Sequence, residues 1–386
     1  MSEWKTVRLG DVCEIAAGQG APQGDSNYCD EGTPFVKAGN LIELIEGKSE
    51  KQIQKVSEEV AKSHKLKKYK ASSILFAKSG MSCMKGYVYQ LKNDCYVVSH
   101  LAIVKPKEDF SDYIEYCLRH IKPNTLVKDE AYPSISLRDI SNLQIPLPPL
   151  ETQKQIAAVL DKCTSLILKY KKILEKYDTL IKSRFIEMFG ENPVESGKWK
   201  VEKFKNICLL ITDGEHTTPQ RCTQGIYLLS ARNVLNHKLQ LDNVDYIDES
   251  EYQRIAKRIV PQENDILLSC SGSVGRVCVV PKGLKFQLVR SVALLRLKKD
   301  VNPIFMEHLI TSDHIQTQIE KSKTQSSQAN LFQGKIAELI GFLPPLYLQN
   351  DFAAFVQQVD KSKFVVQKSL EKAETLYKSL MQEYFN

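Results

Sequence analysis

Polar loops carry the residues of this sequence that could do chemistry, and their side chains suit hydrogen bonding to a nucleic acid. Residues 212–221 are rich in hydrogen-bonding groups, and residues 271–276 combine glycine amides with an arginine. Glycine amides can approach a phosphate closely, and arginine can pair with guanine through two hydrogen bonds. Residues 323–330 repeat amide side chains, which can pair with adenine in the same way. Any one of these loops, taken alone, is better explained as a solvated surface turn.

Motifs of common catalytic sites are absent from the sequence, which favours recognition over catalysis. There is no GxGxxG, GxxxxGK[ST], GxSxG or HExxH pattern. Residues 302–305 lack the second proline of an Asn-Pro-Pro-aromatic motif, and residues 261–265 lack the Glu-x-Lys that completes a nuclease-type cluster of acids. The 7 histidines and 10 cysteines show no metal-ligand spacing. We therefore expect no catalytic residue, no metal site and no bound cofactor in this chain.

Length and composition limit the class of protein. A chain of 386 residues predicts two or three domains, and 42% hydrophobic residues exclude global disorder. The net charge of +7 permits a nucleic-acid partner without demanding one. There is no run of 18 apolar residues, no apolar signal core at the start and no CxxC pair. These features predict a cytoplasmic protein with reduced thiols and no membrane partner.

The chain repeats itself with a period near 196 residues. Residues 147–189 and 343–385 align without a gap and share 17 identities in 43 positions, where unrelated sequences would share about three. The shared segment opens on Leu-Pro-Pro-Leu in both copies. Residues 32–41 and 225–234 form a weaker but ordered match ahead of it. The period indicates a tandem duplication of a whole domain, because solenoid repeats are 20 to 50 residues long.

Each copy of the repeat ends in a segment that reads as a long helix with a heptad seam. Residues 151–189 contain no proline or glycine, and their apolar positions are spaced alternately by four and three. The first seam consists of Ile156, Leu160, Cys163, Ile167, Tyr170, Leu174, Tyr177 and Ile181. The second consists of Phe352, Val356, Val359, Val366, Leu370, Ala373 and Tyr377, with an interruption at Lys363. The pattern predicts that the helices pair as an antiparallel coiled coil with a pseudo-two-fold axis. The alternative is two unrelated helices, each packed on its own domain.

The segments ahead of the helices read as mixed α/β domains. Apolar runs at 73–76 and 97–104, and again at 265–268 and 288–295, predict strands. Short helices are expected at 111–121 and 303–321. We therefore predict an α+β fold with two similar domains at residues 1–146 and 191–342, separated by long helices at 147–190 and 343–386.

This organisation resembles the DNA-specificity subunit of type I restriction–modification systems, over essentially the whole chain. The most specific parts are residues 145–158, with their Ile-Pro-Leu-Pro-Pro-Leu start, and residues 212–219 followed by 230–234. The first domain departs from the pattern, because residues 18–22 replace the Asp-Gly-x-His-x-x-Pro run. That departure weakens a loop-by-loop transfer to the first domain but not the resemblance.

The resemblance implies a non-catalytic subunit that recognises double-stranded DNA. Each domain would be a target recognition domain that reads one half of an asymmetric bipartite site. The long helices would set the spacer and dock two modification subunits, which bring S-adenosylmethionine and methylate adenine. Restriction subunits, which are motor–nucleases using ATP and Mg²⁺, would join for cleavage. Two other functions stay open from the residues: a stand-alone nuclease or methyltransferase-associated polypeptide, and a coiled-coil scaffold without a DNA role.

Loop chemistry and the motif match together select the candidate DNA-contacting residues. In the first domain they are Lys78, Ser79, Lys85, His100, Tyr132 and Ser134. In the second domain they are His216, Thr218, Arg221, Arg232, Ser271, Ser273, Arg276, Gln325 and Gln328.

Overall fold

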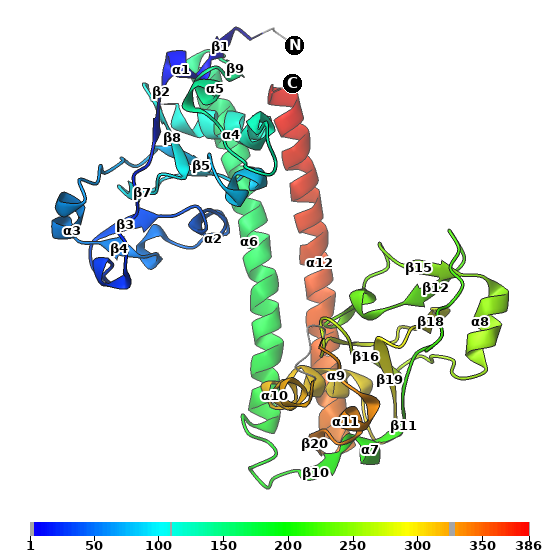
Figure 1. Cartoon of the computed structure of the whole chain (residues 1–386). Coiled ribbons are helices and arrows are strands. Elements are labelled where there is room, and N and C mark those ends of the chain that lie inside the picture. Colours follow the sequence, from blue (N-terminus) through cyan, green and yellow to red (C-terminus); the bar gives the residue numbers. More distant parts are fainter. Residues whose placement is uncertain (1–3, 109, 324–328, 386) are drawn as a thin grey trace. The chain divides into compact units, whose positions relative to one another are not determined.

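The computed structural model describes residues 4–108, 110–323 and 329–385, and the chain divides into two compact units (Figure 1). The first unit contains Met1–Leu174 and Val365–Asn386, and the second contains Glu175–Phe364. Each unit combines one α/β domain with parts of the two long helices α6 (Leu150–Phe189) and α12 (Leu346–Phe385). Because this division cuts through both helices, the predicted four-part division along the sequence stays a prediction.

Small sheets form the domain of the first unit. β2 (Cys13–Ala17), β8 (Leu101–Pro106), β5 (Ile74–Ala77) and β6 (Val88–Gln90) form an antiparallel sheet in that order. β4 (Lys55–Val56), β3 (Thr33–Val36) and β7 (Tyr96–Val97) form a second sheet in which β3 and β7 are parallel. β1 (Thr6–Arg8) pairs with β9 (Gln144–Pro146). The α-helices of this domain are α1 (Leu9–Val12), α2 (Asn40–Ile45), α3 (Glu58–Ser63), α4 (Ser111–Ile121) and α5 (Leu137–Ser141).

The domain of the second unit repeats this topology. β11 (Cys208–Asp213), β19 (Val292–Leu297), β16 (Ile266–Ser269) and β17 (Val277–Val279) form the antiparallel sheet. β15 (Asp245–Ile247), β12 (Ile226–Leu229) and β18 (Phe286–Leu288) form the sheet with a parallel pair, and β10 (Lys200–Lys203) pairs with β20 (Ile340–Leu343). A hairpin of β13 (Val234–Leu235) and β14 (Lys238–Leu239) is added. The helices are α7 (Phe204–Ile207), α8 (Glu249–Ala256), α9 (Pro303–Thr311), α10 (Asp313–Ser322) and α11 (Gln333–Ala337). The shared strand order confirms the α+β class and the internal repeat.

The prediction of a helix at residues 303–321 is wrong in one respect, because the segment forms two helices, α9 and α10, that are separated at Ser312. The backbone of Ser312 is extended, with φ −66° and ψ 149°. Its hydroxyl donates to the Leu309 carbonyl at 2.7 Å, which ends α9 and lets α10 start in a new direction. Serine competes with the helix for such backbone groups, a local effect that hydrophobic spacing does not reveal.

In each unit the long helices pack against one another. In the second unit, Lys363 of α12 pairs with Asp178 of α6 at 2.6 Å, and the rings of Phe352 and Phe185 lie 5.3 Å apart. Residue numbers rise along one helix as they fall along the other, so the packing is antiparallel. In the first unit, Lys171 lies 3.7 Å from Glu374. The predicted antiparallel coiled coil is therefore confirmed within each unit.

The heptad seam explains which residues of these helices are buried. Ile156, Leu160 and Cys163 are buried, and the remaining members of the first seam are buried or half-buried. Lys363 interrupts the second seam because its ammonium forms the cross-helix ion pair with Asp178. Most of the stability of such helices comes from packing of the apolar face rather than from helix propensity. Among the described residues, no helix is both long and apolar enough to cross a membrane.

Candidate nucleic-acid interface

Three loops that lie far apart in the sequence meet in the first unit. One follows β5 (residues 78–80), one precedes β8 (residues 99–100), and one precedes α5 (residues 133–135). The amide of Lys78 donates to the His100 carbonyl at 2.9 Å, and the Gly80 amide donates to Pro133 at 2.9 Å. We refer to residues 78–80, 99–100 and 133–135 as the first three-loop cluster.

The first three-loop cluster holds four of the six candidate residues of this domain. The hydroxyl of Ser79 lies 2.8 Å from Nδ1 of His100, and a bridge joins the backbones of Ser79 and Ser134. Lys78 supplies the backbone bonds just described. Of the other two, Tyr132 adjoins the cluster with a side chain that is 82% exposed, and Lys85 is exposed at the end of the following 3₁₀ turn. The structure therefore brings these candidates close together, while their contact with DNA stays a prediction.

The second unit builds a matching cluster from the same three backbone bonds. The Cys270 amide donates to the Ser291 carbonyl at 2.8 Å, and the Gly272 amide donates to the Ala329 carbonyl at 3.2 Å. The Leu331 amide donates to the Cys270 carbonyl at 2.9 Å. In the first unit the last bond has its counterpart between Ile135 and Lys78, at 2.8 Å. We refer to residues 270–272, 290–291 and 329–331 as the second three-loop cluster. Gly80 and Gly272 take φ values of +75° and +72°, which glycine adopts without strain.

The candidate DNA-contacting residues of the second domain lie in several separate loops of the second unit. Ser271 lies in the second three-loop cluster, and Ser273 is exposed in the turn beside it. Arg276 closes that turn, because its amide donates to the Ser269 hydroxyl at 2.9 Å, and its side chain is half-buried. Gln325 and Gln328 lie outside the described residues.

Arg221 and Arg232 share one carboxylate that the sequence did not single out. Nε of Arg221 donates to Asp245 at 2.9 Å, and Nη2 of Arg232 donates to the other oxygen of Asp245 at 2.6 Å. Burial alone would raise the pKa of the Asp245 carboxyl, but the hydrogen bonds from the two guanidinium groups outweigh it and lower the pKa. Asp245 therefore stays ionised and orients both arginines. No local sequence signal identifies Asp245, because its partners lie 24 and 13 residues away.

His216 and Thr218 lie in a loop that has a counterpart in the first domain. The Gly214 amide donates to the Val292 carbonyl at 3.1 Å, and the Gly18 amide donates to the Leu101 carbonyl at 3.1 Å, so the loop that begins at Gly214 corresponds to the loop that begins at Gly18. His216 and Thr218 are exposed, and Nε2 of His216 lies 3.1 Å from Asp213. The first domain therefore departs from the motif in both the length and the side chains of this loop, because Gly18 and Pro22 are one residue closer in sequence than Gly214 and Pro219.

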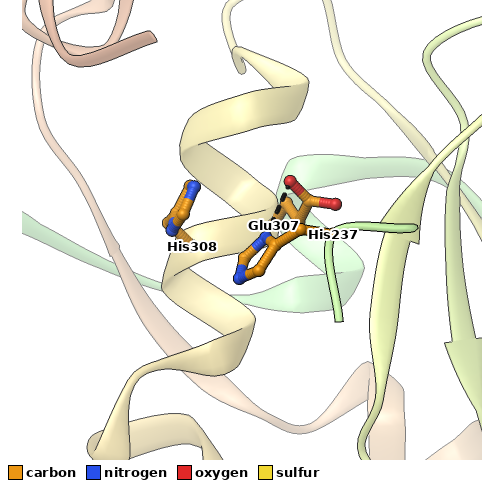
Figure 2. A group of neighbouring side chains, drawn as sticks. All are labelled: His237, Glu307 and His308. Atoms are coloured by element: carbon orange, nitrogen blue, oxygen red, sulfur yellow. Dashed lines mark ion pairs between the residues drawn. The ribbon is translucent and has the colours of Figure 1, made fainter. Parts of the chain in front are cut away.

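His237, Glu307 and His308 form the one group of potential metal ligands found among the described residues (Figure 2). They line a pocket of about 700 Å³ within the second unit. Nδ1 of His237 lies 3.1 Å from Glu307, whose other oxygen accepts from the Val279 amide at 3.1 Å. The two imidazole rings stack, with centroids 4.3 Å apart and planes 20° apart. Lone pairs in nearly parallel planes do not converge on one ion, so the geometry favours a structural contact between the β13–β14 hairpin and α9.

Comparison with known proteins identifies the family. Residues 1–176 and 197–374 match the family model described as type I restriction modification DNA specificity domain. The chain belongs to this family. The matched ranges include both three-loop clusters and most of the two long helices. The two α/β domains therefore lie within the matched DNA specificity domains of this family.

Individual relatives agree with the family. The chain is 27% identical over 199 residues to the type I restriction enzyme MjaIX specificity subunit of Methanocaldococcus jannaschii, covering 50% of this chain and 45% of that protein. It is 23% identical over 293 residues to the MjaVIII specificity subunit of the same organism, covering 70% and 68%. The crystal structure of a type I S subunit from M. genitalium shares the fold, with a TM-score of 0.62, 13% identity and 99% and 96% coverage. The match to the MjaIX subunit thus spans less than half of that relative.

Proposed function

We propose that this chain is the DNA-recognition subunit of a type I restriction–modification complex and that each domain reads one half of an asymmetric bipartite site. The observation that carries the proposal is the pair of three-loop clusters. The same three backbone bonds hold the loops together in both units, while the side chains differ. A shared scaffold with different side chains gives two readers of different sequences, because base edges are distinguished by the hydrogen-bonding groups that meet them.

The long helices are proposed to set the spacer between the half-sites and to dock two modification subunits. Apolar side chains on their outer surfaces support this role: Leu166 is 45% exposed, Leu180 46% and Leu376 52%. These side chains are accessible to a partner protein, and a docked subunit would remove their apolar surface from water. Methylation of adenine with S-adenosylmethionine is assigned to those subunits, and ATP- and Mg²⁺-dependent cleavage to restriction subunits. The absence of a cofactor, metal or active site in this chain stays a prediction, as does a cytoplasmic location.

Methylation mapping tests this function. Adenine methylation in the source genome should follow a two-part motif with a fixed unspecific gap. The chain, co-purified with its modification subunits, should bind a duplex of that motif far more tightly than one with either half scrambled. Affinity should fall steeply with salt, because phosphate contacts release counterions.

The same assays separate the alternative functions. Turnover by the isolated chain, with divalent metal or a methyl donor, would show a stand-alone enzyme. Affinity that does not respond to salt or sequence would favour a scaffold without a DNA role.

A further inference from the structure

We infer that a second side-chain cluster in each domain reads base edges beside the three-loop cluster: Tyr28, Lys37 and Gln54 in the first domain, and Arg221, Arg232 and Asp245 in the second. This inference rests on the proposed function and names the groups that would make the two half-sites differ. In it, the arginines and Lys37 contact bases, Asp245 and Gln54 are positioning residues, and Tyr28 supports Lys37.

The two clusters occupy equivalent places on the repeated scaffold. Asn40 caps its turn by accepting from the Lys37 amide at 2.9 Å, and Asn233 accepts from the Ser230 amide at 2.9 Å. The turns that follow β3 and β12 therefore have the same local structure. Lys37 therefore corresponds to Ser230, and Arg232 lies two residues further along the same turn, so the two domains place a cation at different positions of one shared turn.

Strand register places the remaining members of the clusters in correspondence. Thr33 of β3 pairs with Val56 of β4, and Ile226 of β12 pairs with Ile247 of β15. Gln54 lies two residues before Val56, and Asp245 lies two residues before Ile247, so Gln54 corresponds to Asp245. Ahead of β3 and β12, the Cys29 amide donates to Lys55 at 3.0 Å and the Cys222 amide to Tyr246 at 2.9 Å. Tyr28 therefore corresponds to Arg221, the residue just before Cys222.

Different chemistry fills these equivalent places. In the first domain, the Lys37 ammonium donates to Oε1 of Gln54 at 2.7 Å and lies 4.2 Å from the centre of the Tyr28 ring. In the second domain, Arg221 and Arg232 donate to the two oxygens of Asp245. The first cluster thus holds one cation through the amide of Gln54, and the second holds two cations through the carboxylate of Asp245.

The clusters lie where the carboxyl ends of parallel strands meet. The Val98 amide donates to Val36 at 3.0 Å, and the Val289 amide donates to Leu229 at 3.0 Å. The chain continues from these points into the turns that carry Lys37 and Arg232 and into residues of the three-loop clusters. In the second unit, the Ala231 amide donates to the Ser291 hydroxyl at 3.0 Å, which joins the two sites directly. The cations therefore border the three-loop clusters.

Stability does not account for these contacts. Arg221 and Arg232 are 45% and 47% exposed, and ion pairs at such a surface contribute little to folding. Arg221 bonds only through Nε among the described residues, so both its Nη groups can donate to a ligand. A guanidinium held by a carboxylate presents its remaining donors in a fixed direction, which suits bidentate contact with O6 and N7 of guanine. We therefore expect guanine in the half-site read by the second domain.

Base-by-base binding measurements on the complex with modification subunits test the inference. Every base pair of the mapped motif is changed in turn, and affinities are measured for Arg221→Ala, Asp245→Asn and Lys37→Ala. Arg221→Ala should lose roughly 5- to 150-fold discrimination at a guanine of one half-site. Asp245→Asn should weaken discrimination at the same half-site, and Lys37→Ala should act only on the other half-site.

Lys285→Ala is the matched control. Lys285 also pairs with an acid, Glu249 at 2.7 Å, and is 50% exposed, but it precedes the amino end of β18 rather than following its carboxyl end. It should lower affinity slightly and equally for all sequences. The inference is overturned if the three variants behave like this control while the unaltered complex still discriminates the bipartite motif. If the unaltered complex does not discriminate, the proposed function fails, and the inference fails with it.

Discussion

The buried glutamine that follows each Leu-Pro-Pro-Leu segment allows a prediction that compares the two repeats directly. Gln349 is fully buried. Its Nε2 donates to the backbone carbonyl of Pro344 at 2.8 Å and to that of Asp300 at 3.2 Å, and its Oε1 accepts from the Asn302 amide at 2.8 Å. Gln153, its counterpart, is 4% exposed and donates to Pro148 at 2.7 Å. Its Oε1 is buried without a hydrogen-bond partner. The two copies therefore differ in how much their glutamine contributes.

Replacing each glutamine by alanine should expose this difference. A buried hydrogen bond contributes about 1 kcal/mol, and partners left unpaired cost more. Gln349→Ala removes three hydrogen bonds and leaves the carbonyls of Pro344 and Asp300 and the amide of Asn302 without these partners. We therefore expect the free energy of unfolding to fall by about 3 kcal/mol or more. Gln153→Ala removes one bond and also removes an unsatisfied oxygen, so we expect a loss of about 1 kcal/mol or less.

Urea unfolding of the two variants measures these losses, with tryptophan fluorescence following the transition. Trp4 reports on the first unit, which contains Gln153. Trp199 reports on the second unit, which contains Gln349, since its indole donates to the Phe189 carbonyl at 2.8 Å. Gln349→Glu is a useful companion, because it keeps the volume but replaces the donating amide with an acid. Equal losses for the two alanine variants, or a larger loss for Gln153→Ala, would refute this reasoning.

Three further predictions follow from local features. Burial lowers the pKa of the His308 imidazole to about 3, so the folded chain binds fewer protons than the unfolded chain between about pH 3 and 6.5. Urea unfolding should therefore show the second unit losing stability as pH falls below about 6.5, by at most ~2 kcal/mol at pH 5, and His308→Leu should lack this slope. An added Cβ at Gly214 would lie 2.4 Å from the Leu288 carbonyl, whereas at Gly20 it would meet nothing within 4 Å. Gly214→Ala should thus lower the midpoint of thermal unfolding, with a cost of about 1–3 kcal/mol, and Gly20→Ala should not. Finally, four residues added to the middle of each long helix lengthen it by about 6 Å. Methylation mapping should then find a spacer longer by about two base pairs. Altered half-site sequences would contradict the proposed role of the helices.

Much of this architecture was predictable because its signals are local or periodic. The spacing of apolar residues such as Ile156, Leu160 and Cys163 predicts a buried helical seam, since one turn of helix sets which side chains share a face. The 196-residue repeat predicts two equivalent domains, and Ser79-Gly80 and Ser271-Gly272 predict turns. Each of these inferences uses residues close in sequence or a comparison of the chain with itself.

Other features were decided by the tertiary structure alone. Hydrophobic spacing gave no sign that Lys363 would pair with Asp178 across the helices, and no motif marked Asp245 as the partner of Arg221 and Arg232. The three-loop clusters join segments 20 to 60 residues apart through backbone bonds. Backbone amides and carbonyls are common to all residues, so their pairing leaves no trace in residue type. The sequence by itself therefore determined the repeat and the faces of its helices, whereas the grouping of polar side chains into a recognition surface depended on the folded backbone.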